Sequence, residues 1–178
     1  MLKMIVKGIG LDSNTGQPVL VLTDLNKSRA LPILIGAAEA SSISQGLSRK
    51  QVERPLTHDL ILNTIEALGY EVKRVDLVDE RDGAYIACIV LSLTQEEPLE
   101  GAAEEFLAEE VVIDARPSDA IALAVRDDVP IYVHEGLILN GSIAMDVERD
   151  QAEKDEFSKF VADLKPSDFR MPDKENQS

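Results

Sequence analysis

The chain has few of the residues that mark several large classes of protein. It contains one cysteine, Cys88, and no tryptophan, and aromatic residues make up 4% of its 178 residues. A single cysteine excludes an intramolecular disulfide and gives no cysteine cluster for zinc. The three tyrosines are not spaced as a base-stacking platform, so a single-strand binder of the stacking type is not expected.

Long hydrophobic runs and common catalytic signatures are also missing. No apolar run reaches the roughly 18 to 20 residues that cross a bilayer. The opening stretch, MLKMIVKGIGLDS, has lysines within its short apolar run and no small-residue cleavage site. We therefore expect neither a membrane span nor a signal peptide. A cytoplasmic location is the expectation that follows. The sequence contains no Gly-rich phosphate loop, no G-x-G-x-x-G, no nucleophile elbow and no H-E-x-x-H.

Positive charge is scarce and unevenly distributed. Lys and Arg number 18 against 33 Asp and Glu, which gives a net charge of −15. Residues 1–74 carry 9 basic and 7 acidic side chains, whereas residues 75–178 carry 9 and 26. Such a field repels phosphate backbones at long range. Binding of nucleic acid would therefore depend on a local group of Arg and Lys or on bound divalent cations.

The hydrophobic pattern predicts a single domain of strands and helices. We expect strands at residues 2–9, 18–22, 30–35, 71–78, 84–93, 111–113 and 129–133. The strand at 111–113 is expected to be short and buried. Helical spacing predicts helices at 37–49, 57–68, 117–125 and 150–164, and the charged stretch 96–110 predicts a solvated loop. The small residues of 37–49 would allow this helix to approach a sheet or a second subunit closely.

A weak internal sequence similarity suggests a duplication within the domain. The apolar residues 33–35 precede Glu39 and a small-residue helix, and Ile113 precedes Asp119 and an alanine-rich helix, at an offset of about 80 residues. Both halves would then present an acid early in a helix that follows a strand.

Two short strings, RPLTHD and RPSD, place Arg-Pro before a hydroxyl residue and an acid at the start of a helix. Helix capping explains part of this pattern, with Thr57 and Ser118 as N-caps and the acids stabilised by the helix dipole. Capping does not explain an arginine in each string or the neighbouring His58. A shared functional site therefore remains as the alternative.

If the strings converge in space, their side chains suit phosphoryl chemistry. His58 could act as general acid or base. Carboxylates could hold one or two Mg²⁺ or Mn²⁺ ions, and guanidinium and hydroxyl groups could bind phosphate. The candidate metal ligands are Glu39, Asp59, Asp114 and Asp119, and the candidate phosphate-binding residues are Arg54, Thr57, Arg116 and Ser118. The other histidine, His134, is expected in a surface turn.

Three motifs in this order, LPILIGAAEA, RPLTHDL and DARPSDAIALA, closely resemble the bifunctional nuclease family over roughly residues 3–140. The resemblance implies an α+β fold with a strongly twisted mixed β-sheet, homo-oligomers, and cleavage of both DNA and RNA. The family's motif positions fall on Glu39, Arg54, Thr57, His58, Asp59, Asp114, Arg116, Ser118 and Asp119. Many members have serine where this chain has Ala115, so no role for that hydroxyl carries over.

These observations lead to one main expectation and two alternatives. We expect residues 1–140 to form the nuclease-like domain, 141–170 a helical extension packed on it, and 171–178 a disordered tail. The main expectation is a divalent-metal-assisted nuclease with little sequence preference, in which Glu39, His58, Asp59 and Asp119 are catalytic. The alternatives are a non-catalytic, homo-oligomeric binding or regulatory module, and a hydrolase of small phosphodiesters or nucleotides. Substrate length separates the two hydrolases.

Overall fold

The computed structural model describes residues 1–49, 52–94 and 109–144. The helix predicted at 150–164, the extension from residue 145 onward and the predicted tail lie outside the described residues, as does nearly all of the loop predicted at 96–110. The predicted domain arrangement therefore stays a prediction.

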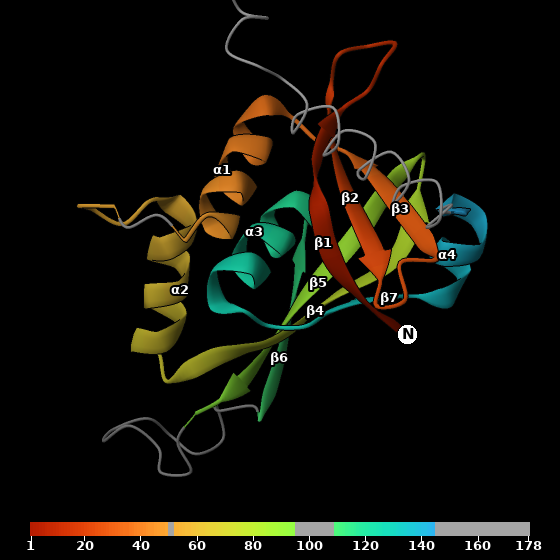
Figure 1. Cartoon of the computed structure of the whole chain (residues 1–178). Coiled ribbons are helices and arrows are strands. Elements are labelled where there is room, and N and C mark those ends of the chain that lie inside the picture. Colours follow the sequence, from red (N-terminus) through yellow and green to blue (C-terminus); the bar gives the residue numbers. More distant parts are fainter. Residues whose placement is uncertain (50–51, 95–108, 145–178) are drawn as a thin grey trace, which may run out of the picture. The chain divides into compact units, whose positions relative to one another are not determined.

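The described residues form one eight-stranded mixed sheet, with the strand order β6-β5-β4-β7-β1-β2-β3-β8. Only β4 and β7 pair in parallel, and every other neighbouring pair is antiparallel. Figure 1 shows β1, β2 and β3 running steeply across the direction of β4 and β5, so the sheet is strongly twisted. The predicted α+β fold is confirmed. The strands are β1 Leu2–Leu11, β2 Pro18–Asp24, β3 Arg29–Leu34, β4 Tyr70–Arg81, β5 Ala84–Leu93, β6 Glu110–Ala115, β7 Ile131–Val133 and β8 Ile143–Ala144.

The sheet contains two antiparallel three-stranded meanders, each followed by a helix. β1, β2 and β3 lead into α1 (Ala37–Leu47), and β4, β5 and β6 lead into α3 (Pro117–Asp127). The short strand β7 joins the meanders by pairing with β1 on one side and β4 on the other. The weak similarity between the sequences around Glu39 and Asp119 thus corresponds to a repeated order of elements, three strands followed by a helix.

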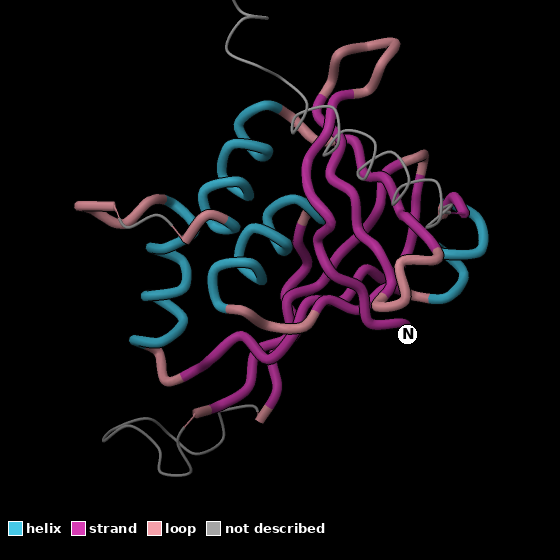
Figure 2. Tube along the Cα trace, in the orientation of Figure 1, coloured by secondary structure: helices cyan, strands magenta, loops and turns pink. Residues whose placement is uncertain are grey.

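Three helices gather beside the sheet, as Figure 2 shows in cyan. α3 packs on β4 and β5 and also contacts α1 and α2 (Thr57–Ala67). Its residues 120–124 are almost completely buried, as the lack of a polar face predicts. A Cβ atom at Gly46 of α1 would lie 2.7 Å from Val125 Cγ2 of α3. The small residues of α1 therefore allow close approach to another helix.

The helix starts differ from the predicted caps. Leu56, not Thr57, is the N-cap of α2, and Arg116, not Ser118, is the N-cap of α3. Pro117 occupies the first position of α3, where its missing N–H costs nothing, and holds the preceding residue extended. Both predicted hydroxyl caps were wrong because each hydroxyl lies inside its helix.

Two other local predictions were also wrong. β6 was expected to be buried, but it is an edge strand, and Val112 and Ile113 are exposed. The turn expected at 134–136 is the start of a further helix, α4 (Glu135–Gly141), in which His134 Nδ1 accepts the Gly136 N–H at 3.2 Å. This helix has seven residues, too few to show a clear period in the sequence.

Asp24 holds the turn between β2 and β3. Its buried carboxylate accepts hydrogen bonds from the Ser28 N–H at 2.7 Å, the Ser28 hydroxyl at 2.6 Å and the Arg29 N–H at 3.0 Å. Burial alone would raise the pKa of this carboxyl, but the hydrogen bonds outweigh burial and the pKa is lowered from its ordinary value. The ionised form is therefore the one that the fold prefers.

We expect Asp24→Asn to lower the free energy of unfolding by about 2 kcal/mol at neutral pH. Because the pKa is lower in the folded than in the unfolded chain, the carboxylate stabilises the fold above the unfolded pKa of about 4, and this contribution is lost as pH falls through the folded pKa. Urea unfolding of both proteins at several pH values should show the difference shrinking below about pH 4. A difference independent of pH would contradict this assignment.

Candidate active site

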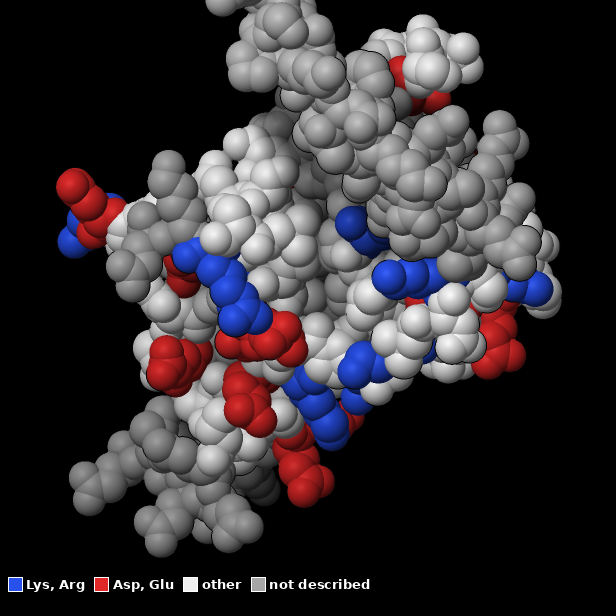
Figure 3. Space-filling model, viewed as in Figure 1, with Lys and Arg blue, Asp and Glu red and all other residues white. Residues whose placement is uncertain are grey.

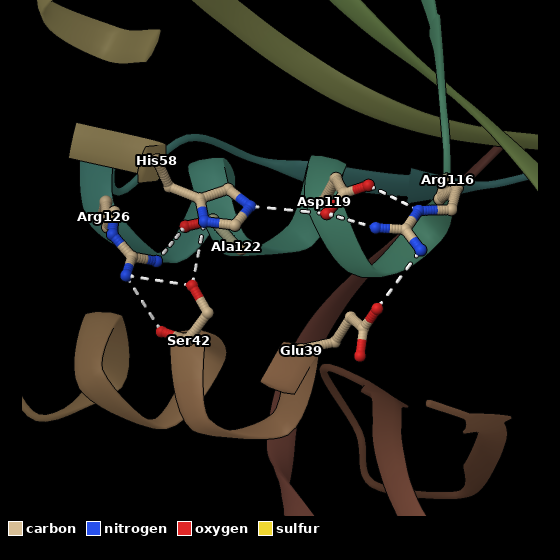
Figure 4. Close-up of polar contacts among 7 residues, drawn as sticks. All are labelled: Glu39, Ser42, His58, Arg116, Asp119, Ala122 and Arg126. Carbon is tan, nitrogen blue, oxygen red and sulfur yellow. Dashed lines mark hydrogen bonds and ion pairs between the residues drawn. The ribbon is translucent and has the colours of Figure 1, made fainter. Parts of the chain in front are cut away.

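Four of the predicted site residues meet in one continuous polar cluster, drawn in Figure 4. Arg116 Nε and Nη2 donate to Asp119 Oδ2 at 2.7 Å and Oδ1 at 3.2 Å. Arg116 Nη1 donates to Glu39 Oε1 at 3.2 Å. His58 Nε2 lies 3.5 Å from Asp119 Oδ1. The cluster comprises Glu39, His58, Arg116 and Asp119, and we refer to it as the Arg116 cluster.

Three helix starts bring the Arg116 cluster together. Glu39 is in the first turn of α1, His58 is the second residue of α2, and Asp119 is in the first turn of α3. The positive end of each helix dipole stabilises an acid at this position. The tertiary packing of α1 and α2 against α3 therefore produces the site that local sequence could only suggest.

Gly36 leaves the space that the Glu39 side chain occupies. A Cβ atom at Gly36 would collide with Glu39 Oε2. The φ of Gly36 is −80°, which any residue can adopt, so space and not backbone conformation accounts for this glycine. A side chain here would force the Glu39 carboxylate to shift from the position in which it accepts from Arg116.

The guanidinium group is the most accessible member of the cluster. The side chain of Arg116 is 67% exposed, against 34% for Asp119, 23% for Glu39 and 14% for His58. Its hydrogen bond with Asp119 and the charges of Asp119 and Glu39 raise the pKa of Arg116 above its ordinary value, so it remains protonated. A guanidinium group that is permanently charged and accessible is suited to bidentate hydrogen bonding with a phosphate.

The cluster lines a surface hollow of about 470 Å³. Glu39 and Arg116 also border a second hollow of about 670 Å³, whose lining includes Ile35, Tyr85 and Ser118. Both volumes fall in the range of small-molecule sites. The accessible guanidinium therefore stands between two spaces that could receive a ligand.

The structure does not bring the other predicted residues into this cluster. Asp59 Oδ1 accepts from Arg126 Nε at 2.8 Å, and its Oδ2 accepts the Leu56 N–H at 2.9 Å. Asp114 lies on β6 opposite Cys88, and Arg54 is exposed and forms no ion pair with another described residue.

The two predicted hydroxyl groups lie in different places. Thr57 is exposed and lines the hollow of the Arg116 cluster. Ser118 is buried and lines the second hollow. Of these two hydroxyl residues, only Thr57 lines the hollow that all four members of the Arg116 cluster border, whereas Ser118 shares the second hollow with Glu39 and Arg116.

Sequence reasoning missed two residues that support the cluster, Ser42 and Arg126. Ser42 Oγ lies 2.9 Å from His58 Nδ1, and Arg126 donates to Ser42 and to Asp59. Each carried a weak signal. Ser42 lies three residues after Glu39, on the same face of α1, and Arg126 is a charged residue at the end of an apolar helix.

The predicted metal ligands are distributed over three places. In residues 1–49, 52–94 and 109–144, no group of three or more His, Cys, Asp or Glu side chains is arranged to hold a metal ion. Among the predicted metal ligands, Glu39 and Asp119 are the pair that the structure brings together, because the same guanidinium binds both. Two carboxylates suit Mg²⁺, which commonly binds one or two protein carboxylates and completes its shell with water and substrate phosphate.

Comparison with known proteins identifies the family. The model of the bifunctional nuclease domain matches residues 20–146, a range that contains the whole Arg116 cluster. The chain belongs to the bifunctional nuclease domain family. The resemblance predicted from the three motifs is confirmed, although the match begins later than residue 3.

The chain is also similar to individual proteins. It is 34% identical over 173 residues to an uncharacterized protein of Mycobacterium tuberculosis (strain ATCC 25618 / H37Rv), covering 93% of this chain and 96% of that protein. It is 29% identical over 138 residues to bifunctional nuclease 2 of Oryza sativa subsp. japonica, covering 77% and 39%. It is 31% identical over 107 residues to bifunctional nuclease 1 of Arabidopsis thaliana, covering 60% and 30%.

None of the helices in the described part of the chain combines the length and the apolar character that a membrane crossing requires.

Proposed function

We propose that this protein is a nuclease that hydrolyses phosphodiester bonds in DNA and RNA with little sequence preference, and that the Arg116 cluster is its active site. The observation that carries the proposal is the accessible guanidinium of Arg116, held by two carboxylates from separate helices above a hollow. Membership of the bifunctional nuclease domain family supports the choice of phosphodiester substrates.

Arg116 is the proposed phosphate-binding residue. In the free protein its five donors are partly taken by Glu39 and Asp119. A phosphodiester entering the hollow offers two non-bridging oxygens on one tetrahedral phosphorus, and a guanidinium can donate a hydrogen bond to each of them in bidentate fashion. Because the side chain is largely exposed, it can exchange a carboxylate for phosphate without disturbing the core.

Once Arg116 turns to the substrate, Glu39 and Asp119 are left as two neighbouring carboxylates. We propose that they then hold Mg²⁺ or Mn²⁺. When bound, such an ion would neutralise phosphate charge and make an attacking water more acidic. Glu39 and Asp119 would hold the ion between α1 and α3, because the two carboxylates bind the same guanidinium from these two helices.

The charge distribution favours recognition through a few local contacts. On the face shown in Figure 3, the basic side chains (blue) lie interspersed with acidic ones (red). With a net charge of −15, long-range attraction of a polynucleotide is weak. This observation, together with the size of the hollow, also supports a second candidate function, the hydrolysis of small phosphodiesters or nucleotides.

The test compares two arginines that each precede a proline. We expect Arg116→Ala to lower the rate of cleavage by about 100-fold, whereas Arg54→Ala should retain most of the activity because Arg54 lies outside the Arg116 cluster. Both variants and the wild type are purified identically. They are assayed on labelled single-stranded DNA, RNA, plasmid and a small chromogenic phosphodiester, with Mg²⁺, Mn²⁺ or EDTA.

Each outcome of this assay has a definite meaning. Cleavage of the polymers that requires metal and is lost with Arg116 supports the proposed nuclease. Cleavage of the small phosphodiester alone favours the second candidate. Equal cleavage by all three proteins indicates a contaminating nuclease, and no cleavage by the wild type favours the non-catalytic, homo-oligomeric module.

A further inference from the structure

We propose that Ser42 and Arg126 fix neutral His58 in the tautomer that carries its proton on Nε2. The imidazole then presents an N–H, not a lone pair, to Asp119 and the hollow. The tautomer is a property of the folded chain and needs no substrate. Its consequence for cleavage rests on the proposed function.

Arg126 limits the hydrogen bonds that the Ser42 hydroxyl can make. Its side chain is 7% exposed, and its Nη2 donates to both the Ser42 carbonyl oxygen at 3.0 Å and Ser42 Oγ at 3.2 Å. Its Nη1 donates to the Ala122 carbonyl at 2.8 Å. A guanidinium can only donate hydrogen bonds. One acceptor position of the Ser42 hydroxyl is therefore permanently occupied.

The contact between Ser42 Oγ and His58 Nδ1, at 2.9 Å, can then take two forms. In the first, the hydroxyl donates its proton to a bare Nδ1. In the second, a protonated Nδ1 donates to Oγ, and the hydroxyl proton has to find another acceptor. Among the hydrogen bonds of the described residues, Ser42 Oγ has no partner besides His58 and Arg126. The first form therefore satisfies all three groups within the protein, whereas the second leaves the hydroxyl proton of half-buried Ser42 to solvent in the hollow.

Asp119 lies on the opposite side of the imidazole ring, as Figure 4 shows, and favours the same tautomer. His58 Nε2 faces Asp119 Oδ1 at 3.5 Å. An ionised carboxylate only accepts hydrogen bonds, so a lone pair on Nε2 would meet the lone pairs of Oδ1. A proton on Nε2 turns this repulsion into attraction. Both neighbours of the imidazole thus select the same tautomer.

This assignment changes the expected role of His58. In the neutral ring the lone pair lies on Nδ1, where Ser42 occupies it, so no lone pair faces the hollow to accept a proton. His58 instead orients the Asp119 carboxylate that also binds Arg116. His58, Ser42 and Arg126 are then positioning residues that act through Asp119.

The tautomer is measurable because the chain has only two histidines. We would label histidine with ¹⁵N and record long-range ¹H–¹⁵N spectra at about pH 8.5, two units above the ordinary imidazole pKa of about 6.5. His134→Asn identifies the second ring, since asparagine preserves the N-cap of α4. We expect His58 to show a protonated Nε2 and an unprotonated, hydrogen-bonded Nδ1.

Two variants of Ser42 separate the hydroxyl from the helix that carries it. Ser42→Ala should shift the Nδ1 resonance to that of a nitrogen without a hydrogen bond, and Ser42→Thr should restore the wild-type value. A protonated Nδ1 in the wild type, either in the other tautomer or as an imidazolium, would overturn the proposal. So would identical Nδ1 shifts in the wild type and Ser42→Ala.

Kinetics test the consequence for cleavage separately. We expect Ser42→Ala to lower kcat by about 10-fold with little change in KM, and Ser42→Thr to restore it. Unchanged kcat in Ser42→Ala would overturn the positioning role. Absence of cleavage by the wild type would overturn the proposed function and leave the spectroscopic result in place.

Discussion

Replacing Asp119 by alanine is expected to lower the cleavage of DNA and RNA by about 1,000-fold or more. Asp119 connects His58 to Arg116 in the Arg116 cluster, since it accepts two hydrogen bonds from Arg116 and lies against His58. Its loss removes a proposed metal ligand and, in the free protein, the partner that holds the guanidinium of Arg116. The rate at saturating enzyme, measured on labelled strands, gives the loss directly.

The same substitution should change stability little. In the ion pair of Asp119 and Arg116 the arginine is exposed and the acid half-buried, and pairs that reach solvent in this way contribute about 0 to 1 kcal/mol. Asp127→Ala is the matched control, because it removes an exposed acid from the other end of α3. We expect wild-type activity from this control. A large drop in the melting temperature of Asp119→Ala, with activity kept in the folded fraction, would show that Asp119 only supports the helix.

Arg126→Ala should have the largest effect on stability, a loss of about 3 kcal/mol or more in the free energy of unfolding. The Arg126 side chain is buried and joins three helices, because it donates to Asp59 of α2, Ser42 of α1 and Ala122 of α3. Removal leaves a cavity and an acid without its partner. Urea unfolding of the wild type and the variant measures the loss.

Arg49→Ala provides the exposed counterpart. Arg49 and Asp128 also form an ion pair at 3.2 Å, but both side chains are more than 70% exposed, at 75% and 84%. This substitution should cost less than about 0.5 kcal/mol. Equal losses for the two arginines would contradict the structural role of Arg126.

A double variant separates the charge from the packing at this position. In Arg126→Leu with Asp59→Leu, neither partner is left as an unmatched charge. Replacing a buried pair by apolar side chains is often neutral, whereas removing one partner is costly. We therefore expect the double variant to be more stable than Arg126→Leu alone. Additive losses would indicate that packing, not charge, carries the contribution of Arg126.

Local sequence was sufficient to predict most strands and helices, because each depends on the period of its own side chains. It was not sufficient to separate the two Arg-Pro strings. Pro117 is the first residue of α3, so Arg116 stands at the helix start and reaches Asp119. In the other string the helix begins two residues after Pro55, which leaves Arg54 in the preceding link.

The sequence could not predict which polar side chains pair with each other in the folded chain, and the reason is a different one. Asp59 has the same local setting as Asp119, in the first turn of a helix after an Arg-Pro pair. What separates them is that Arg126, 67 residues away along the chain, reaches Asp59. Such pairings are decided by how helices pack, and no local pattern of residue types contains that information.

The short strand β7 has a consequence for motion within the domain. It joins the two meanders through three residue pairs on each side, fewer than any two neighbouring strands share within a meander, so this junction has little interstrand pairing to resist local opening. Glu39 follows one meander and Asp119 the other, and Arg116 ties them. A ligand that bridges these two acids would therefore hold the halves of the domain together and slow amide hydrogen exchange along β7 without contacting that strand.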